Sequence, residues 1–109
     1  MDTERSLIAL SALAQDTRLQ TFRHLVRAGE AGLTAGEIAE QLGVLQNTLS
    51  TNLGILHRAG MIRKQREGRS IRYFADFDGM RDLLAFLLED CCAGDATKCQ
   101  PLLDAAICS

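Results

Sequence analysis

The sequence lacks the features that would assign it to a membrane or secreted class. No apolar run approaches the roughly 18 residues that a membrane-spanning helix needs. The N-terminal stretch MDTERSLIAL carries two acidic residues and lacks the apolar core and cleavage site of a secretory signal. We therefore expect a cytoplasmic protein with no membrane partner, whose cysteines are thiols rather than structural disulfides.

Patterns typical of catalysis and of structural zinc are also missing. The chain has only two histidines, His24 and His57, and both fall in predicted helices away from the cysteines. The four cysteines do not follow the paired C-x-x-C spacing of a structural zinc site. No base, nucleophile and orienting group are arranged for a reaction, so the sequence predicts a protein that is not an enzyme and requires no cofactor.

The charge is distributed unevenly along the 109 residues. Residues 41–75 carry six basic side chains against one acid, a net charge of +5, whereas the rest of the chain sums to −7. An acidic body with one basic segment is typical of a protein that binds a polyanion through a single surface. The length fits one domain, small enough for a dimer interface to help bury its apolar surface.

Residues 34–60 predict a helix, a tight turn and a second helix. Thr34 and Glu37 have the spacing of a capping box, and Gly43 suits the turn. The second helix is expected over residues 46–59.

This second helix has an apolar stripe, formed by Leu49, Leu53 and Leu56. The opposite side is small and polar, has no carboxylate, and suits contacts with DNA bases and phosphates; it consists of Asn47, Ser50, Thr51 and Gly54. The alternative is an ordinary helical hairpin, but its solvated face would more often carry Lys and Glu.

After Gly60 the helical spacing of apolar residues ends, and two short runs follow. Residues 61–66 and 69–74 predict a β-hairpin with Glu67-Gly68 as the turn. Arg66 and Arg69 would lie near its tip, where they suit backbone phosphates or the minor groove. The alternative is a solvated hairpin whose charges protect its edges.

Three further helices are predicted. The first covers residues 3–14, and its Leu7, Ile8, Leu10 and Leu13 could form either core or a dimer interface. Asp16 is expected to cap a helix that ends near Ala28, and Asp76 a helix over 77–91.

The cysteines gather behind the last predicted helix, at Cys91, Cys92 and Cys99, with Cys108 near the end. Three thiolates without nitrogen or oxygen ligands suit a trivalent pyramidal ion such as arsenite or antimonite. Two alternatives remain open: small buried side chains in a tail, or a redox switch in which Cys99 is the disulfide partner.

Several stretches in order resemble the arsenic-responsive branch of the ArsR/SmtB family: LSALAQDTRLQTFRHLVRAGEAGLTAGEIAEQLGV, QNTLSTNLGILHRAGMI, REGRSIRY and DGMRDLLAFLLEDCC. The resemblance covers roughly residues 5–99. It implies a mainly α, α+β winged helix-turn-helix with about five helices and a two-stranded wing. It further implies a homodimer joined through its first and last helices. Such a repressor binds double-stranded operator DNA of its own operon and leaves when trivalent arsenic binds.

The resemblance also assigns site residues. The DNA-reading helix is matched by Gln46, Asn47, Ser50, Thr51 and Asn52, the wing by Arg66 and Arg69, and a C-terminal inducer site by Cys91, Cys92 and Cys99. The chain departs from the family in two ways. Many members carry a cysteine cluster where this chain reads EIAEQLG, so that site is absent here. Relatives commonly have His where this chain has Asn52, and either residue can form hydrogen bonds. On a helical wheel Asn52 lies at the side of the polar stripe, which favours a phosphate contact over a base contact.

On this interpretation residues 1–92 form the DNA-binding and dimerisation domain, and residues 93–109 are a tail carrying inducer ligands within the same domain. One alternative keeps the fold but changes the signal to thiol oxidation, persulfide or methylated trivalent arsenic, the last using two thiols. Another is a small arsenical-binding enzyme or metallochaperone, which an inability to bind promoter DNA would favour.

Overall fold

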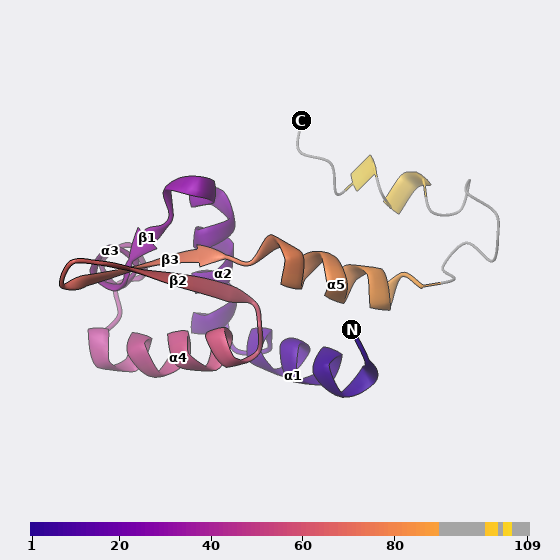
Figure 1. The fold of residues 1–109 in the computed structure, drawn as a ribbon, viewed down its shortest axis with the longest axis horizontal. Coiled ribbons are helices and arrows are strands. Elements are labelled where there is room, and N and C mark those ends of the chain that lie inside the picture. The colour runs from indigo at the N-terminus through magenta and orange to yellow at the C-terminus, as the bar shows by residue number, and fades with distance from the viewer. Residues whose placement is uncertain (90–99, 103, 106–109) are drawn as a thin grey trace.

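The computed structural model describes residues 1–89, 100–102 and 104–105, and it confirms the predicted winged helix-turn-helix fold (Figure 1). In this part of the chain, five α-helices accompany a small antiparallel sheet, and residues 100–102 and 104–105 are also helical. In chain order the elements are α1 (Thr3–Leu13), α2 (Asp16–Ala28), a short 3-10 turn η1 (Gly29–Ala31), β1 (Leu33–Thr34), α3 (Ala35–Leu42), α4 (Gln46–Arg58), β2 (Ile62–Glu67), β3 (Ser70–Ala75) and α5 (Phe77–Leu87).

The core forms where α2, α3 and α4 meet. The predicted apolar stripe of α4, namely Leu49, Leu53 and Leu56, is at most 1% exposed. It packs in one cluster with the fully buried Leu25 of α2 and Ile38 of α3. Because burying each such side chain contributes about 1.5–3 kcal/mol, this cluster fixes which side of α4 faces inward.

Side-chain caps begin four of the helices, and Asp2 supplies the one at α1 by accepting from the backbone N–H at position 5. Thr34 and Glu37 form the predicted capping box, with Oγ1 of Thr34 accepting from the N–H of Glu37 at 3.3 Å and Oε1 of Glu37 accepting from the N–H of Thr34 at 2.9 Å. Asp76 caps α5 as predicted. The prediction that Asp16 caps α2 is wrong: the longer side chain of Gln15 accepts from the backbone N–H at position 18, and Asp16 is the first helical residue.

The sheet contains one strand more than predicted. Its order is β1-β3-β2, with Leu33 opposite Tyr73. Strand β1 has only two residues, which is too short to show an alternating hydrophobic pattern in the sequence, so it was not predicted. The turn also differs, because Glu67 pairs with Ser70 and leaves Gly68 and Arg69 as the turn residues. Both faces of the hairpin tip are exposed, so no hydrophobic alternation marks the ends of its strands.

Helix α5 ends at Leu87, earlier than the predicted 77–91. Leu88 and Glu89 continue as a turn. Residues 90–99 lie outside the described part of the chain, as do residues 106–109, so no test of the four cysteines comes from the structure. No helix within the described ranges has both the length and the apolar character needed to cross a bilayer.

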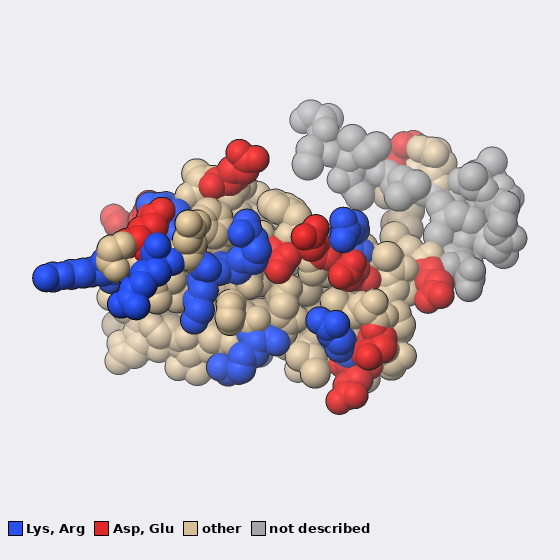
Figure 2. Space-filling model, viewed as in Figure 1, with Lys and Arg blue, Asp and Glu red and all other residues tan. Residues whose placement is uncertain are grey.

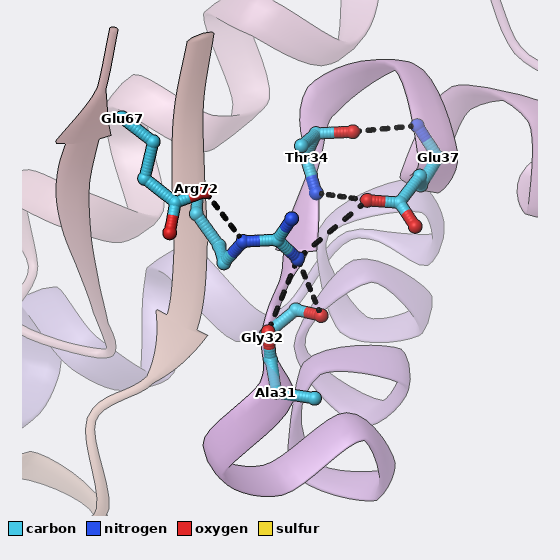
Figure 3. A network of polar contacts seen from close by, with 6 residues as sticks. All are labelled: Ala31, Gly32, Thr34, Glu37, Glu67 and Arg72. Atoms are coloured by element: carbon cyan, nitrogen blue, oxygen red, sulfur yellow. Dashed lines mark hydrogen bonds and ion pairs between the residues drawn. The ribbon is translucent and has the colours of Figure 1, made fainter.

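Arg72 of β3 ties the sheet to the rest of the fold (Figure 3). Its Nε donates to Oε1 of Glu67 at 2.9 Å, and its Nη1 donates to the carbonyl oxygens of Ala31 at 3.1 Å and Gly32 at 3.4 Å. The same Nη1 lies 3.7 Å from Oε1 of Glu37, the carboxylate of the capping box. One guanidinium therefore connects the β-hairpin, the segment before β1 and the start of α3.

The close approach of α5 to the turn after α4 predicts a steric effect at Gly79. A Cβ there would overlap the carbonyl oxygen of Gly60, whereas a Cβ at Gly36 in α3 would meet its nearest neighbour, Nε2 of Gln46, at 3.5 Å. We expect Gly79→Ala to lower the free energy of unfolding by about 1–3 kcal/mol, since backbone must move. The control Gly36→Ala should be neutral or stabilising, because alanine favours helix. Urea denaturation of both variants measures this; equal stabilities would contradict the packing described.

The capping box predicts a pH dependence of stability. The hydrogen bond from the Thr34 N–H, assisted by the Arg72 charge, holds the pKa of Glu37 below its ordinary value of 4.5. The ionised carboxylate therefore adds stability that is complete above pH 4.5 and is lost as the pH falls through the lowered pKa. We expect Glu37→Gln to flatten the decline of the unfolding free energy below pH 4.5. Glu40→Gln, at an exposed position in the same helix, is the control and should leave the decline as in the wild type.

Candidate nucleic-acid interface

The side of α4 opposite its buried leucines is open to solvent. Gln46, Asn47, Ser50 and Thr51 are all exposed, as the sequence predicts. Their amide and hydroxyl groups can donate and accept hydrogen bonds, which base edges in a major groove require. In the part of α4 that carries these residues no acidic side chain is present, so nothing on this face repels phosphates.

The N-terminus of α4 adds main-chain donors to this face. Its N-cap residue, Leu45, makes no side-chain cap hydrogen bond, and the first turn contains no acidic residue. The first backbone N–H groups of a helix have no partner within the helix, and the helix dipole places partial positive charge there. This end of α4 therefore suits an anion such as a DNA phosphate.

A polar groove of about 460 Å³ lies between the starts of α3 and α4 and the first half of β3 with the turn before it. It brings together Gln46, Ser50 and Arg69, three of the predicted site residues. Thr34 and Tyr73 also line it and were not predicted to do so, because they are distant in sequence and meet only through the pairing of β1 with β3.

The hairpin carries five of the chain's twelve Lys and Arg residues, and its tip forms one end of the molecule (Figure 1, Figure 2). Arg66 lies on β2 and Arg69 in the turn, both exposed. Nε of Arg66 donates to the carbonyl oxygen of Gly68 at 3.3 Å, which folds its side chain back over the turn. Arg63 packs over the ring of Phe74 at 5.1 Å, so its aliphatic stem and charge are held against the base of the hairpin.

Asn52 lies differently from the other predicted DNA-contacting residues. It is only 7% exposed, and its Oδ1 accepts a hydrogen bond from Nη1 of Arg18 at 3.1 Å. The sequence placed it at the side of the polar stripe, but the structure turns its amide inward, toward α2. A 3.6-residue period locates Asn52 between the two faces and cannot show that an arginine 34 residues away will meet it.

The far end of the polar face carries a basic side chain, that of Arg58. Gly54 is a member of the predicted small, polar side of this helix. Nη1 of Arg58 lies 3.2 Å from the position of a Cβ at Gly54, so this long side chain folds back along the helix. The (i, i+4) spacing of the two residues was the available signal.

Helices α1 and α5 pack together at the end of the molecule opposite the hairpin (Figure 1). Both helices expose large apolar side chains. On α1 the inward side is formed by Ser6, Ala9 and Ala12. The outward side chains are 38–61% exposed and come from both helices: Leu7, Ile8, Leu10, Phe77, Leu84 and Leu87. We call this set the apolar face. Exposed apolar side chains gathered on two helices that contact each other are typical of a protein–protein interface.

The predicted ion ligands Cys91, Cys92 and Cys99 lie outside the described residues, as does Cys108. Among the residues that are described, no group of three His, Cys, Asp or Glu side chains could hold a metal ion.

Comparison with known proteins supports the fold assignment. Residues 13–65 match a family described as a helix-turn-helix domain. A biofilm growth-associated repressor from Agrobacterium fabrum is 35% identical over 86 residues, which cover 79% of this chain and 71% of the relative.

Two further relatives are named for resistance operons. A candidate arsenical resistance operon repressor from Halobacterium salinarum is 32% identical over 74% of this chain and 66% of its own length. A candidate mercury resistance operon repressor from Streptomyces lividans is 33% identical over 77% of this chain and 63% of its own length. The matches to these two relatives thus span slightly less than two thirds of their lengths.

Among solved structures, the homodimeric winged helix-turn-helix DNA-binding domain of a candidate ArsR-family transcriptional regulator from Mycobacterium bovis superposes with a TM-score of 0.66 at 26% identity. The match covers 78% of this chain and 77% of that domain. The chain belongs to the ArsR/SmtB family of winged helix-turn-helix regulators.

Proposed function

We propose that the protein is a dimeric transcriptional repressor that binds double-stranded operator DNA and is released when trivalent arsenic binds its cysteine thiolates. The observation that carries the DNA half is the exposed polar face of α4 beside a groove that contains Arg69. A helix of this kind enters the major groove, and the hairpin reaches the adjacent backbone or minor groove.

The apolar face of α1 and α5 supports a homodimer. It lies at the end of the molecule opposite the hairpin, so pairing two copies there leaves both hairpins free (Figure 1). A two-fold dimer places its two recognition helices in successive major grooves, about 34 Å apart, and requires an inverted repeat in the DNA.

The chemistry of the donor set supports trivalent arsenic. Cys91, Cys92 and Cys99 provide three thiols within nine residues, beginning four residues after α5 ends at Leu87. Soft thiolate ligands favour soft ions, and three of them match a pyramidal trivalent ion. The similarity to a relative named for an arsenical resistance operon supports the same choice. Because α5 contributes to the apolar face, an ion that distorts its end would alter the dimer and thereby the spacing of the recognition helices.

The wing arginines give the first prediction about DNA. We expect Arg66→Ala and Arg69→Ala each to weaken binding to all DNA sequences and to reduce the slope of log affinity against log salt by about 1, since each removes one phosphate contact. Fluorescence anisotropy at several salt concentrations measures both effects. Arg81→Ala, on α5 and 71% exposed, is the control and should change neither. If all three variants bind DNA as the wild type does, the hairpin is not a DNA-contacting wing.

The inducer is tested with reduced protein and DNA from its own promoter. We expect arsenite to weaken operator binding by roughly 5–150-fold, the usual range of allosteric coupling. Cys91→Ser and Cys99→Ser should abolish the response, and Cys108→Ser serves as the matched control. Tight binding that arsenite does not change would retain the DNA-binding function and reject the inducer.

The same variants separate the competing signals. A methylarsenite response that survives Cys99→Ser indicates a two-thiol site. Release by mercuric ion but not arsenite would favour the function in the name of the Streptomyces lividans relative. Release by peroxide or persulfide, reversed by a reductant, would indicate a thiol redox sensor.

A further inference from the structure

Arg18 connects three helices through one side chain. It lies in the first turn of α2, where Gln15 accepts from its backbone N–H at 2.9 Å. Its Nε donates to the carbonyl oxygen of Ala12 in α1 at 2.6 Å, and its Nη1 donates to Oδ1 of Asn52 in α4 at 3.1 Å. Over the described residues, the bond to Asn52 is the one side-chain hydrogen bond that links α4 to another helix.

The geometry of this link is restrictive. Asn52 is 7% exposed, so its amide oxygen depends on a protein partner rather than on bulk water. The guanidinium is planar with its donors in a fixed fork, so two bonds in different directions hold it in one orientation. A displacement of Ala12 must therefore move Arg18 or break its bond to Asn52.

A groove beside Arg18 reduces the direct packing of α1 against α4, so the hydrogen-bonded link carries more of the contact between these helices. A groove of about 370 Å³ separates part of α1 from α4, with Leu7 and Ile8 on one side and Ile55 on the other. Arg18 also lines this groove, and its side chain bridges α1 and α4 by hydrogen bonds to both helices. Leu7 and Ile8 are 61% and 50% exposed and belong to the apolar face, so the α1 end of the link lies beside the proposed dimer interface.

We propose that Arg18 is a positioning residue that transmits movement of α1 at the dimer interface to the recognition helix α4. This inference rests on the proposed function and adds the route within it. Helix α1 packs against α5, so a change at the end of α5 reaches α1 by direct contact. The path continues from Ala12 through Arg18 to Asn52, and Asn52 acts through α4 rather than by touching DNA.

A pair of substitutions at Asn52 tests the route. Asn52→Leu keeps the branched shape and removes the oxygen acceptor, whereas Asn52→Asp keeps an oxygen that can accept from Arg18. The readout is the ratio of operator dissociation constants with and without saturating arsenite. We expect the ratio to fall below about twofold in Asn52→Leu, from the 5–150-fold expected for the wild type, and to be retained in Asn52→Asp. Arsenite binding to the DNA-free protein should be unchanged in both variants.

Asn47→Leu is the matched control, because it makes the same chemical change on the exposed face of α4. It should weaken operator binding and leave the ratio as in the wild type. A ratio that Asn52→Leu leaves unchanged would overturn the proposal, even if the variant loses thermal stability or operator affinity. A wild-type ratio of one would instead reject the inducer half of the proposed function.

Hydrogen exchange of the DNA-free protein gives a readout that needs neither operator nor inducer. We expect the amides of α4 to exchange severalfold faster in Asn52→Leu and in Arg18→Lys, whose ammonium lacks the fixed fork, and at the wild-type rate in Asn52→Asp. Exchange in Asn52→Leu equal to that of the wild type would show that Arg18 does not hold α4, and would overturn the proposal whatever the DNA assays report.

Discussion

The burial of three leucines on α4 is the constraint on which the site depends. With Leu49, Leu53 and Leu56 locked against α2 and α3, the helix cannot rotate without exposing them to water. The opposite face is therefore presented to solvent in a fixed orientation. A small, polar recognition surface of this kind does not stabilise the fold, so its placement comes entirely from the apolar side of the same helix.

Polar links then set the positions of the elements around α4. Arg72 attaches the hairpin to the segment before β1 and to the capping box of α3, and in doing so shapes the groove that Arg69 shares with the start of α4. Arg18 performs a comparable task on the other side, between α1 and α4. Guanidinium bonds thus attach the wing to the start of α3, and attach the proposed recognition helix α4 to α1 beside the proposed dimer interface.

Local chemistry explains what the sequence predicted well. The Thr34–Glu37 capping box, the Asp76 cap and the turn at Gly43 are each encoded within four residues, and the leucine stripe repeats along one helix. Features that depend on distant residues were missed. Strand β1 exists only because β3 pairs with it, and Asn52 faces inward because Arg18 offers it a donor. The same holds for the groove: Gln46, Ser50 and Arg69 could be named from the sequence, but not their meeting with Thr34 and Tyr73. The proposed inducer cysteines lie beyond the described helices, so the case for them rests on their chemistry and on similarity.

The central claim is that two copies of α4 bind one face of operator DNA and that the dimer dissociates from it when the thiols bind arsenic. A hydroxyl-radical footprint of reduced protein on its own promoter tests this most directly. The account predicts two protected half-sites on one face of the duplex, centred about 10–10.5 base pairs apart or a multiple of this, both lost on addition of arsenite. A single protected patch would contradict the dimer, and a footprint that persists unchanged in arsenite would contradict the proposed release.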